Sequence, residues 1–381
     1  MKNIKRIVKN ILYGPLLWLE LLVIKTSRKS ISDVIDLSTD YILSLRVESR
    51  PGFKFTVSSI ERDLYSTIYC ICYLGLVGKL ESIPECERLE ILNYIQSKQC
   101  NDGLYRDNKL ATPASEDGQG WGWNHLLPHV LIALDYLNSK PKKTFKYIFD
   151  ICDDDNWIEN IFSGSDPLNA SNKFMNICVA LQYSRDFMNC KSSGAIIEKI
   201  NKHAEQFLLD RYSINYHKMN VLDCSENVKI IYHLLPSILY DMKVDQRKAE
   251  RIINMSIKTQ NLWGGFGTSA LSSACEDMDS VYNLSMLNHD AYRGTVASIL
   301  IKFLVNIQVN QNTDGGFVYI KYKRFCYGGS KVLSSDSGQS NAFATWFRVL
   351  SIAFATTKVK KGISPNYWNF SNVSGYHWFS K

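Results

Sequence analysis

The chain has 381 residues, of which 45% are hydrophobic and 21% are charged, a balance typical of a soluble globular protein. The formal net charge is +7, but no basic stripe interleaved with aromatic residues follows the basic N-terminus, so we expect no nucleic-acid partner. The ten cysteines are scattered without a CxxC pair. This spacing argues against a disulfide framework and a zinc ribbon, and it predicts a cytoplasmic, reducing location.

Residues 1–29 form a basic and apolar segment. Basic residues open it, and residues 11–24 are apolar apart from Glu20 and contain Pro15. This stretch is too short and too interrupted for a membrane-spanning helix, and it lacks the small-residue cleavage site of a signal peptide. Two interpretations stay open. Residues 1–25 make a peripheral contact with a membrane surface, or they form a helix that packs on the outside of the protein.

A glycine turn recurs along the rest of the chain. Residues 99–105 read QCNDGLY, residues 260–266 read QNLWGGF, and residues 311–317 read QNTDGGF. Gln260 and Gln311 are 51 residues apart, and Gln99 precedes Gln260 by 161 residues, close to three such periods. The same period predicts weaker copies of the turn at residues 49–55, 153–157 and 208–216.

Apolar stretches with three- and four-residue spacing surround these turns and predict helices, as in residues 129–137, 228–239 and 342–354. Glycine supplies the positive φ at which a helix stops, and the Gln before it can bond freed backbone groups and tie one repeat to the next. Two helices in each of about six repeats predict an all-α fold, an (α/α)6 toroid over residues 30–360 around a central cavity. We expect residues 361–381 to form a tail that packs on the ring.

At these turns the chain resembles the terpenoid cyclase and protein prenyltransferase superfamily of α/α toroids, in particular its squalene-hopene cyclase-like members. Residues 260–266 and 311–317 look like the repeat motif of that family, in which Gln and an aromatic residue flank a glycine turn. The resemblance extends from about Ser30 to about Thr357. It implies the toroid fold and, for a class II terpene cyclase-like enzyme, an isomerase or lyase reaction on an isoprenoid.

The sharpest cluster of candidate site residues comprises Glu276, Asp277 and Asp279. Repulsion and partial burial raise the pKa of at least one such carboxyl, and a protonated carboxylic acid can protonate an alkene. By resemblance, Asp277 and Asp279 match the first and middle positions of the Asp-x-Asp-Asp motif, whose middle residue is the proton donor, while Ser280 replaces its last Asp. The alternative is a helix cap, with Asp277 or Asp279 capping and Glu276 favouring the helix dipole.

A second cluster of candidates contains Trp121, Trp123, His125 and His129. The two histidines share a helix face if Pro128 does not break the helix. No Glu stands between them in a zincin pattern, so we expect no metal. The aromatic rings can hold a carbocation by cation–π attraction or stack on a sugar. The alternative is that both Trp side chains are repeat-contact core.

The phase of the repeat places three more candidate substrate-binding residues on the same rim: Asn172, Asp336 and Trp346. The zinc pattern of the prenyltransferase branch is absent, because Cys275 precedes Asp277 instead of following it by two positions. We therefore expect neither a metal nor another cofactor.

Three functions compete. The first is protonation-initiated cyclisation or isomerisation of an isoprenoid, with Asp279 as the acid and Asp277 as its partner. The second is a carbohydrate-active (α/α)6 hydrolase or lyase, in which Glu116 or Asp117 faces an acid of the first cluster across a glycan at ~5–10 Å. The third is a non-catalytic toroid that binds a ligand or partner at its rim.

Overall fold

The computed structural model describes residues 2–26, 29–48, 50–111, 122–154, 156–162, 166–212, 218–359 and 368–379. Over these ranges the chain forms fourteen α-helices, a few short 3₁₀-helices and one antiparallel pair of strands, β1 (Phe325–Cys326) and β2 (Ser334–Ser335). In that pair, Phe325 lies opposite Ser335 and Cys326 opposite Ser334. The structure confirms the predicted all-α class.

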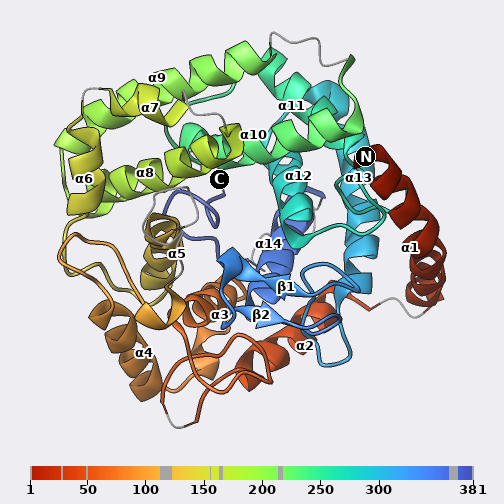
Figure 1. Cartoon of the computed structure of the whole chain (residues 1–381), viewed down its shortest axis with the longest axis horizontal. Helices are drawn as coiled ribbons and strands as arrows, with labels where there is room; N and C mark the ends of the chain where they lie inside the picture. Colours follow the sequence, from red (N-terminus) through yellow and green to blue (C-terminus); the bar gives the residue numbers. More distant parts are fainter. Residues whose placement is uncertain are drawn as a thin grey trace.

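Six helices form the centre of the molecule. They are α3 (Leu64–Leu76), α5 (Trp123–Tyr136), α8 (Pro167–Phe187), α10 (Val221–Asp241), α12 (Ala274–Met286) and α14 (Ala342–Val359). Each packs against the next in chain order, and α14 returns to pack against α3, so the contacts close a circuit (Figure 1). Every residue of α3 is buried, as expected for a helix with neighbours on all sides.

The remaining helices alternate with the central ones along the chain. They are α1 (Lys2–Thr26), α2 (Ile31–Ser44), α4 (Glu85–Ser97), α6 (Lys146–Cys152), α7 (Trp157–Phe162), α9 (Ser192–Tyr212), α11 (Gln246–Lys258) and α13 (Arg293–Asn306). Figure 1 shows α2, α4, α6, α9, α11 and α13 around the outside of the circuit. The strongly one-sided pattern of α11, with Ala249, Ile252, Ile253 and Met255 buried, fits a helix with one face in water.

The predicted glycine turns follow four of these outer helices. A short β-bridge closes each one: Arg46 with Phe53, Gln99 with Tyr105, Gln260 with Phe266, and Gln311 with Phe317. The glycines at 103, 264 and 315 have φ of 88°, 104° and 86°, which side chains with a Cβ rarely adopt. A Cβ at Gly315 would also lie 2.1 Å from the carbonyl oxygen of Leu37. Glycine is therefore required there for both conformation and space.

The two weakest predicted turns have other outcomes. Residues 153–157 cover the break between α6 and α7. At residues 208–216, α9 continues to Tyr212, and the rest of that stretch lies outside the described residues.

In the three turns that contain it, the Gln bonds the next repeat, as predicted. The side-chain amides of Gln99 and Gln260 donate to the carbonyls of Lys143 and Ile299, both at 2.9 Å. Gln311 donates to the carbonyl of Val34 at 3.0 Å. Val34 belongs to α2, the outer helix that precedes α3. The last turn is therefore bonded to the beginning of the circuit.

Helix α1 packs outside the circuit beside α13. Its buried Leu17 forms a small hydrophobic cluster with Ala270, Leu271 and Val309, and Glu20 pairs with Lys321 at 2.5 Å. The segment 368–379 lacks regular helix or strand structure and packs on the central helices, where Tyr376 contacts His129 of α5 and Trp346 of α14. Across the described ranges, no helix has the length and apolar character needed to cross a membrane.

Candidate functional site

A cavity of ≈ 190 Å³ lies between the central helices. Side chains from α5, α8, α10, α12 and α14 line it. Its aromatic wall comprises Tyr232, Tyr319, Tyr327, Phe343, Phe347 and Tyr376, and its other lining residues are His125, His129, Leu168, Lys229, His233, Ser273, Cys275 and Asp279.

Asp279 is the one carboxyl that lines this cavity in the part of the chain that the structure describes. It stands in the second turn of α12 and is buried, and no hydrogen bond is among the interactions that shift its pKa. Burial raises the pKa of Asp279 well above its usual range, and the nearby Glu276 and Asp277 add to this effect, although Lys229 opposes it. A buried carboxyl without a hydrogen-bonded partner favours its protonated form.

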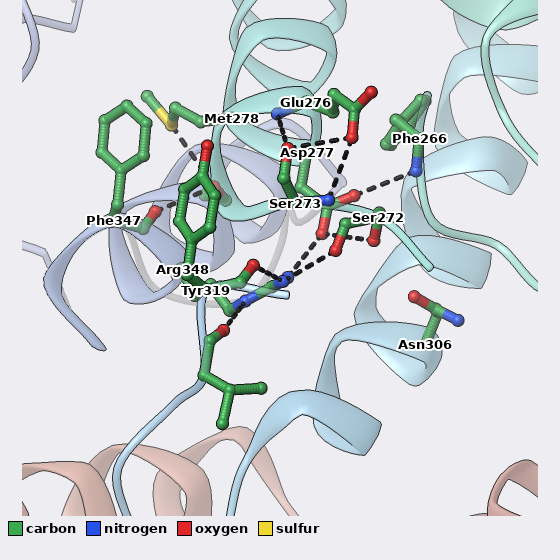
Figure 2. A network of polar contacts seen from close by, with 12 residues as sticks. Phe266, Ser272, Ser273, Glu276, Asp277, Met278, Asn306, Tyr319, Phe347 and Arg348 are labelled. Atoms are coloured by element: carbon green, nitrogen blue, oxygen red, sulfur yellow. Dashed lines mark hydrogen bonds and ion pairs between the residues drawn. The ribbon is translucent and has the colours of Figure 1, made fainter. Parts of the chain in front are cut away.

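Asp277 is not among the residues that line the cavity, and its side chain belongs to a polar network (Figure 2). Its carboxylate accepts from Arg348 Nη1 at 2.6 Å, from Ser272 Oγ at 2.9 Å and from the backbone N–H of Phe266 at 2.9 Å. Both side chains of the ion pair are fully buried. Because Phe266 ends a glycine turn and Arg348 belongs to α14, Asp277 ties three segments together.

Arg348 completes the same network. It also donates to the backbone carbonyls of Val318, Ser272 and Tyr319, at 2.9, 3.1 and 2.9 Å. A buried guanidinium with so many acceptors stays charged. The predicted pair Asp277–Asp279 is therefore divided, since Asp277 is held by Arg348 while Asp279 faces the cavity.

Glu276 caps the N-terminus of α12. Its carboxylate accepts from the Ser273 backbone N–H at 3.1 Å, and Ser273 Oγ accepts from the Glu276 N–H at 3.1 Å. This reciprocal pair is a capping box. Lys229 Nζ lies 3.7 Å from the same carboxylate. The N-cap is thus Ser273 with Glu276 as its capping-box partner, and the alternative in which Asp277 or Asp279 caps the helix is wrong.

The predicted histidine pair also reaches the cavity. Helix α5 is continuous through Pro128, so His125 and His129 share one face, with ring centroids 5.0 Å apart. Burial lowers the pKa of His125 to about 4 and that of His129 well below its usual range. Both rings are therefore neutral at pH 7. His125 Nδ1 lies 3.3 Å from Asn176 Oδ1, and the buried Asn172 also interacts with this ring.

The other predicted substrate-binding residues lie elsewhere. Trp346 is fully buried and does not line the cavity. Its ring stacks parallel to that of Tyr69, with centroids 4.9 Å apart, and its centroid lies 5.3 Å from that of His129. Trp123 is buried against Tyr65, which matches the core alternative for this side chain. Asp336 is exposed and lies 3.9 Å from Arg324, away from the cavity lining. Trp121 lies outside the described residues, as do Glu116 and Asp117.

Several cavity residues were not predicted. Phe343 and Phe347 stand four apart on α14, a spacing that the sequence displays but that a core helix shares. Tyr232 and His233 lie within the apolar run of α10. The sequence signal for them was a pair of polar rings among apolar residues. Tyr376 comes from the C-terminal segment and packs 4.4 Å from His129. No repeat pattern reaches that segment.

No three His, Cys, Asp or Glu side chains of the described ranges are grouped so that they could hold a metal ion. All ten cysteines are unpaired. Comparison with known proteins finds no family model and no curated protein that matches the chain.

Proposed function

We propose that the chain is an (α/α)6 toroid of the terpenoid cyclase and prenyltransferase superfamily. Three features support the proposal: the alternation of outer and central helices, the closed circuit of central helices, and the glycine turns whose Gln side chains bond the next repeat. Such bonding between neighbours is the organising contact of a repeat protein.

Within this fold, we propose that the protein cyclises or isomerises an isoprenoid in the central cavity, with Asp279 as the proton donor. The observation that carries the proposal is a carboxyl of strongly raised pKa, with no hydrogen bond among the interactions that shift it, at a wall of six aromatic rings. A protonated carboxylic acid in such a site acts as a general acid. The aromatic faces stabilise the positive charge that protonation creates.

The proposed reaction needs no other reagent. The Asp279 O–H transfers its proton to one carbon of an alkene, a C–H bond forms, and the π electrons leave a carbocation on the neighbouring carbon. Attack by a second double bond closes a ring and moves the charge. A neutral imidazole then takes a proton from an adjacent carbon and restores an alkene. His129 suits this role, because it lines the cavity and its ring is neutral at pH 7.

The glycan alternative is less favoured by the same geometry. Glycoside hydrolysis uses two carboxyls across the substrate. Asp279 is the single one among the described lining residues, since Arg348 holds Asp277 and Ser273 holds Glu276. The predicted partners Glu116 and Asp117 belong to the stretch that is not described.

The test incubates the protein with linear isoprenoids of increasing length, namely geraniol, farnesol and squalene, in D₂O. We expect a rearranged product that carries deuterium at carbon, because the proton from Asp279 exchanges with solvent. Asp279→Asn should abolish turnover while the fold is kept. Asp290→Asn removes a fully exposed acid and should leave the rate unchanged. Turnover by Asp279→Asn at the wild-type rate, or a product without deuterium, would contradict the proposal.

A further inference from the structure

Helix α1 carries an exposed apolar stripe. Leu12, Leu16, Leu19 and Val23 follow one another at intervals of four, three and four residues, and each is between 47% and 62% exposed. This spacing places them on one face of the helix. Trp18 and Leu22 are exposed beside them. A contiguous apolar patch of this kind on a protein surface marks a contact with something else.

The stripe is held rigidly, because the opposite face of α1 is anchored to the body of the protein. Tyr13 stacks on Tyr322 with ring centroids 5.8 Å apart, and Leu17 is buried. A Cβ at position 14 would come within 2.8 Å of the Trp263 ring, so Gly14 lets the helix lie against the glycine turn. Glu20 is the one acid of the helix, and it is held by Lys321 and Tyr322.

From this arrangement we infer that α1 docks the protein on the surface of an anionic lipid bilayer. The spacing of the stripe, continued toward the N-terminus, reaches Lys9 and Lys5. Lys2 and Arg6 precede it, and Lys25, Arg28 and Lys29 follow it. Basic residues near an apolar helix face attract anionic headgroups while the apolar side chains enter the acyl boundary. Trp18 supplies a ring suited to the headgroup level.

The charges disfavour a second copy of the chain as the occupant. Basic residues stand at both ends of the stripe, so two α1 helices packed face to face would bring like charges together in the parallel and in the antiparallel orientation. A bilayer with anionic headgroups presents the complementary charge along the whole helix. The inference does not depend on the chemistry of the cavity.

The test measures co-sedimentation of the full chain with vesicles of phosphatidylcholine alone and with phosphatidylglycerol added. We expect binding to the mixed vesicles that weakens as salt is raised. The triple variant Leu16→Ser, Leu19→Ser, Val23→Ser should bind at least about tenfold more weakly. Lys5→Gln with Lys9→Gln should reduce the preference for anionic vesicles by roughly tenfold or more.

The matched control removes exposed apolar side chains elsewhere, with Ile60→Ser and Leu89→Ser, which are 90% and 54% exposed. It should bind vesicles as the wild type does. Circular dichroism should show all variants folded, because every changed side chain that the structure describes is exposed. Equal vesicle binding by the stripe variant and the wild type would overturn the inference. So would a concentration-dependent dimer, seen by light scattering, that the stripe variant abolishes.

Discussion

The two sides of α12 use the same residue type in opposite ways. Asp277 and Asp279 are two positions apart, which in a helix turns one side chain almost directly away from the other. Asp277 accepts hydrogen bonds from a buried guanidinium, a serine hydroxyl and one backbone N–H. Asp279 shares the cavity with aromatic rings, and no hydrogen bond contributes to its pKa shift. Partner geometry, more than depth of burial, therefore separates a structural acid from a candidate catalytic one.

The largest expected effect comes from Asp277→Asn. This change leaves the charge of Arg348 fully buried and uncompensated, and breaking a buried ion pair in this way costs roughly 3–5 kcal/mol of unfolding free energy. Urea denaturation measures the loss. Arg348→Met added to Asp277→Asn should recover part of it, since the unpaired charge is then gone. If Asp277→Asn alone is as stable as the wild type, the ion pair with Arg348 does not stabilise the fold, and the contrast between Asp277 and Asp279 fails.

Asp279→Asn should instead increase the free energy of unfolding. A folded-state pKa raised above the unfolded value of ~3.9 means that ionisation is harder in the folded protein, so the wild type loses about 1.4 kcal/mol of stability for each pH unit between the two values. Asparagine does not titrate. The variant should therefore be more stable than the wild type at pH 8, and the difference should shrink at pH 5. Denaturation at both pH values checks this, and a difference that does not change with pH would count against a protonated Asp279.

The smallest effect is expected at Glu276, in the first turn of α12. Glu276→Ala removes one half of the capping box at Ser273, which is worth about 0.5–1 kcal/mol. Its thermal unfolding should shift slightly, and turnover of the isoprenoid should be kept. A complete loss of turnover would show that Glu276 takes part in the proton transfer and does not only cap the helix.

Local patterns in the sequence predicted a large part of the fold. A glycine turn requires positive φ at a fixed position, and a Gln before it can satisfy backbone groups nearby, so both needs are visible within seven residues. The turn at residues 260–266 was found in this way, and the structure closes it with a β-bridge between Gln260 and Phe266. The weak turns at residues 153–157 and 208–216 carry no such Gln-Gly pair. Their prediction depended on the period alone, and it was less accurate.

The candidate site was predictable only in part, because partner choice is a property of the tertiary structure. The acids at 276–279 were visible as a cluster, but the sequence could not show that Arg348, 71 residues from Asp277, takes one of them. His125 and His129 were visible through their four-residue spacing. Tyr376 lay beyond every repeat, and its place at the cavity follows only from the path of the C-terminal segment.

The closed circuit of central helices has a consequence for how the protein is made. Helix α3 leaves the ribosome well before one of its two neighbours in the circuit, because α14 begins 266 residues after Leu76. Until α14 is synthesised, one flank of α3 lacks its partner, and Tyr69 lacks the Trp346 ring on which it stacks. A nascent chain stalled before Ala342 would therefore present that apolar flank to chaperones, since the first and last repeats fold together.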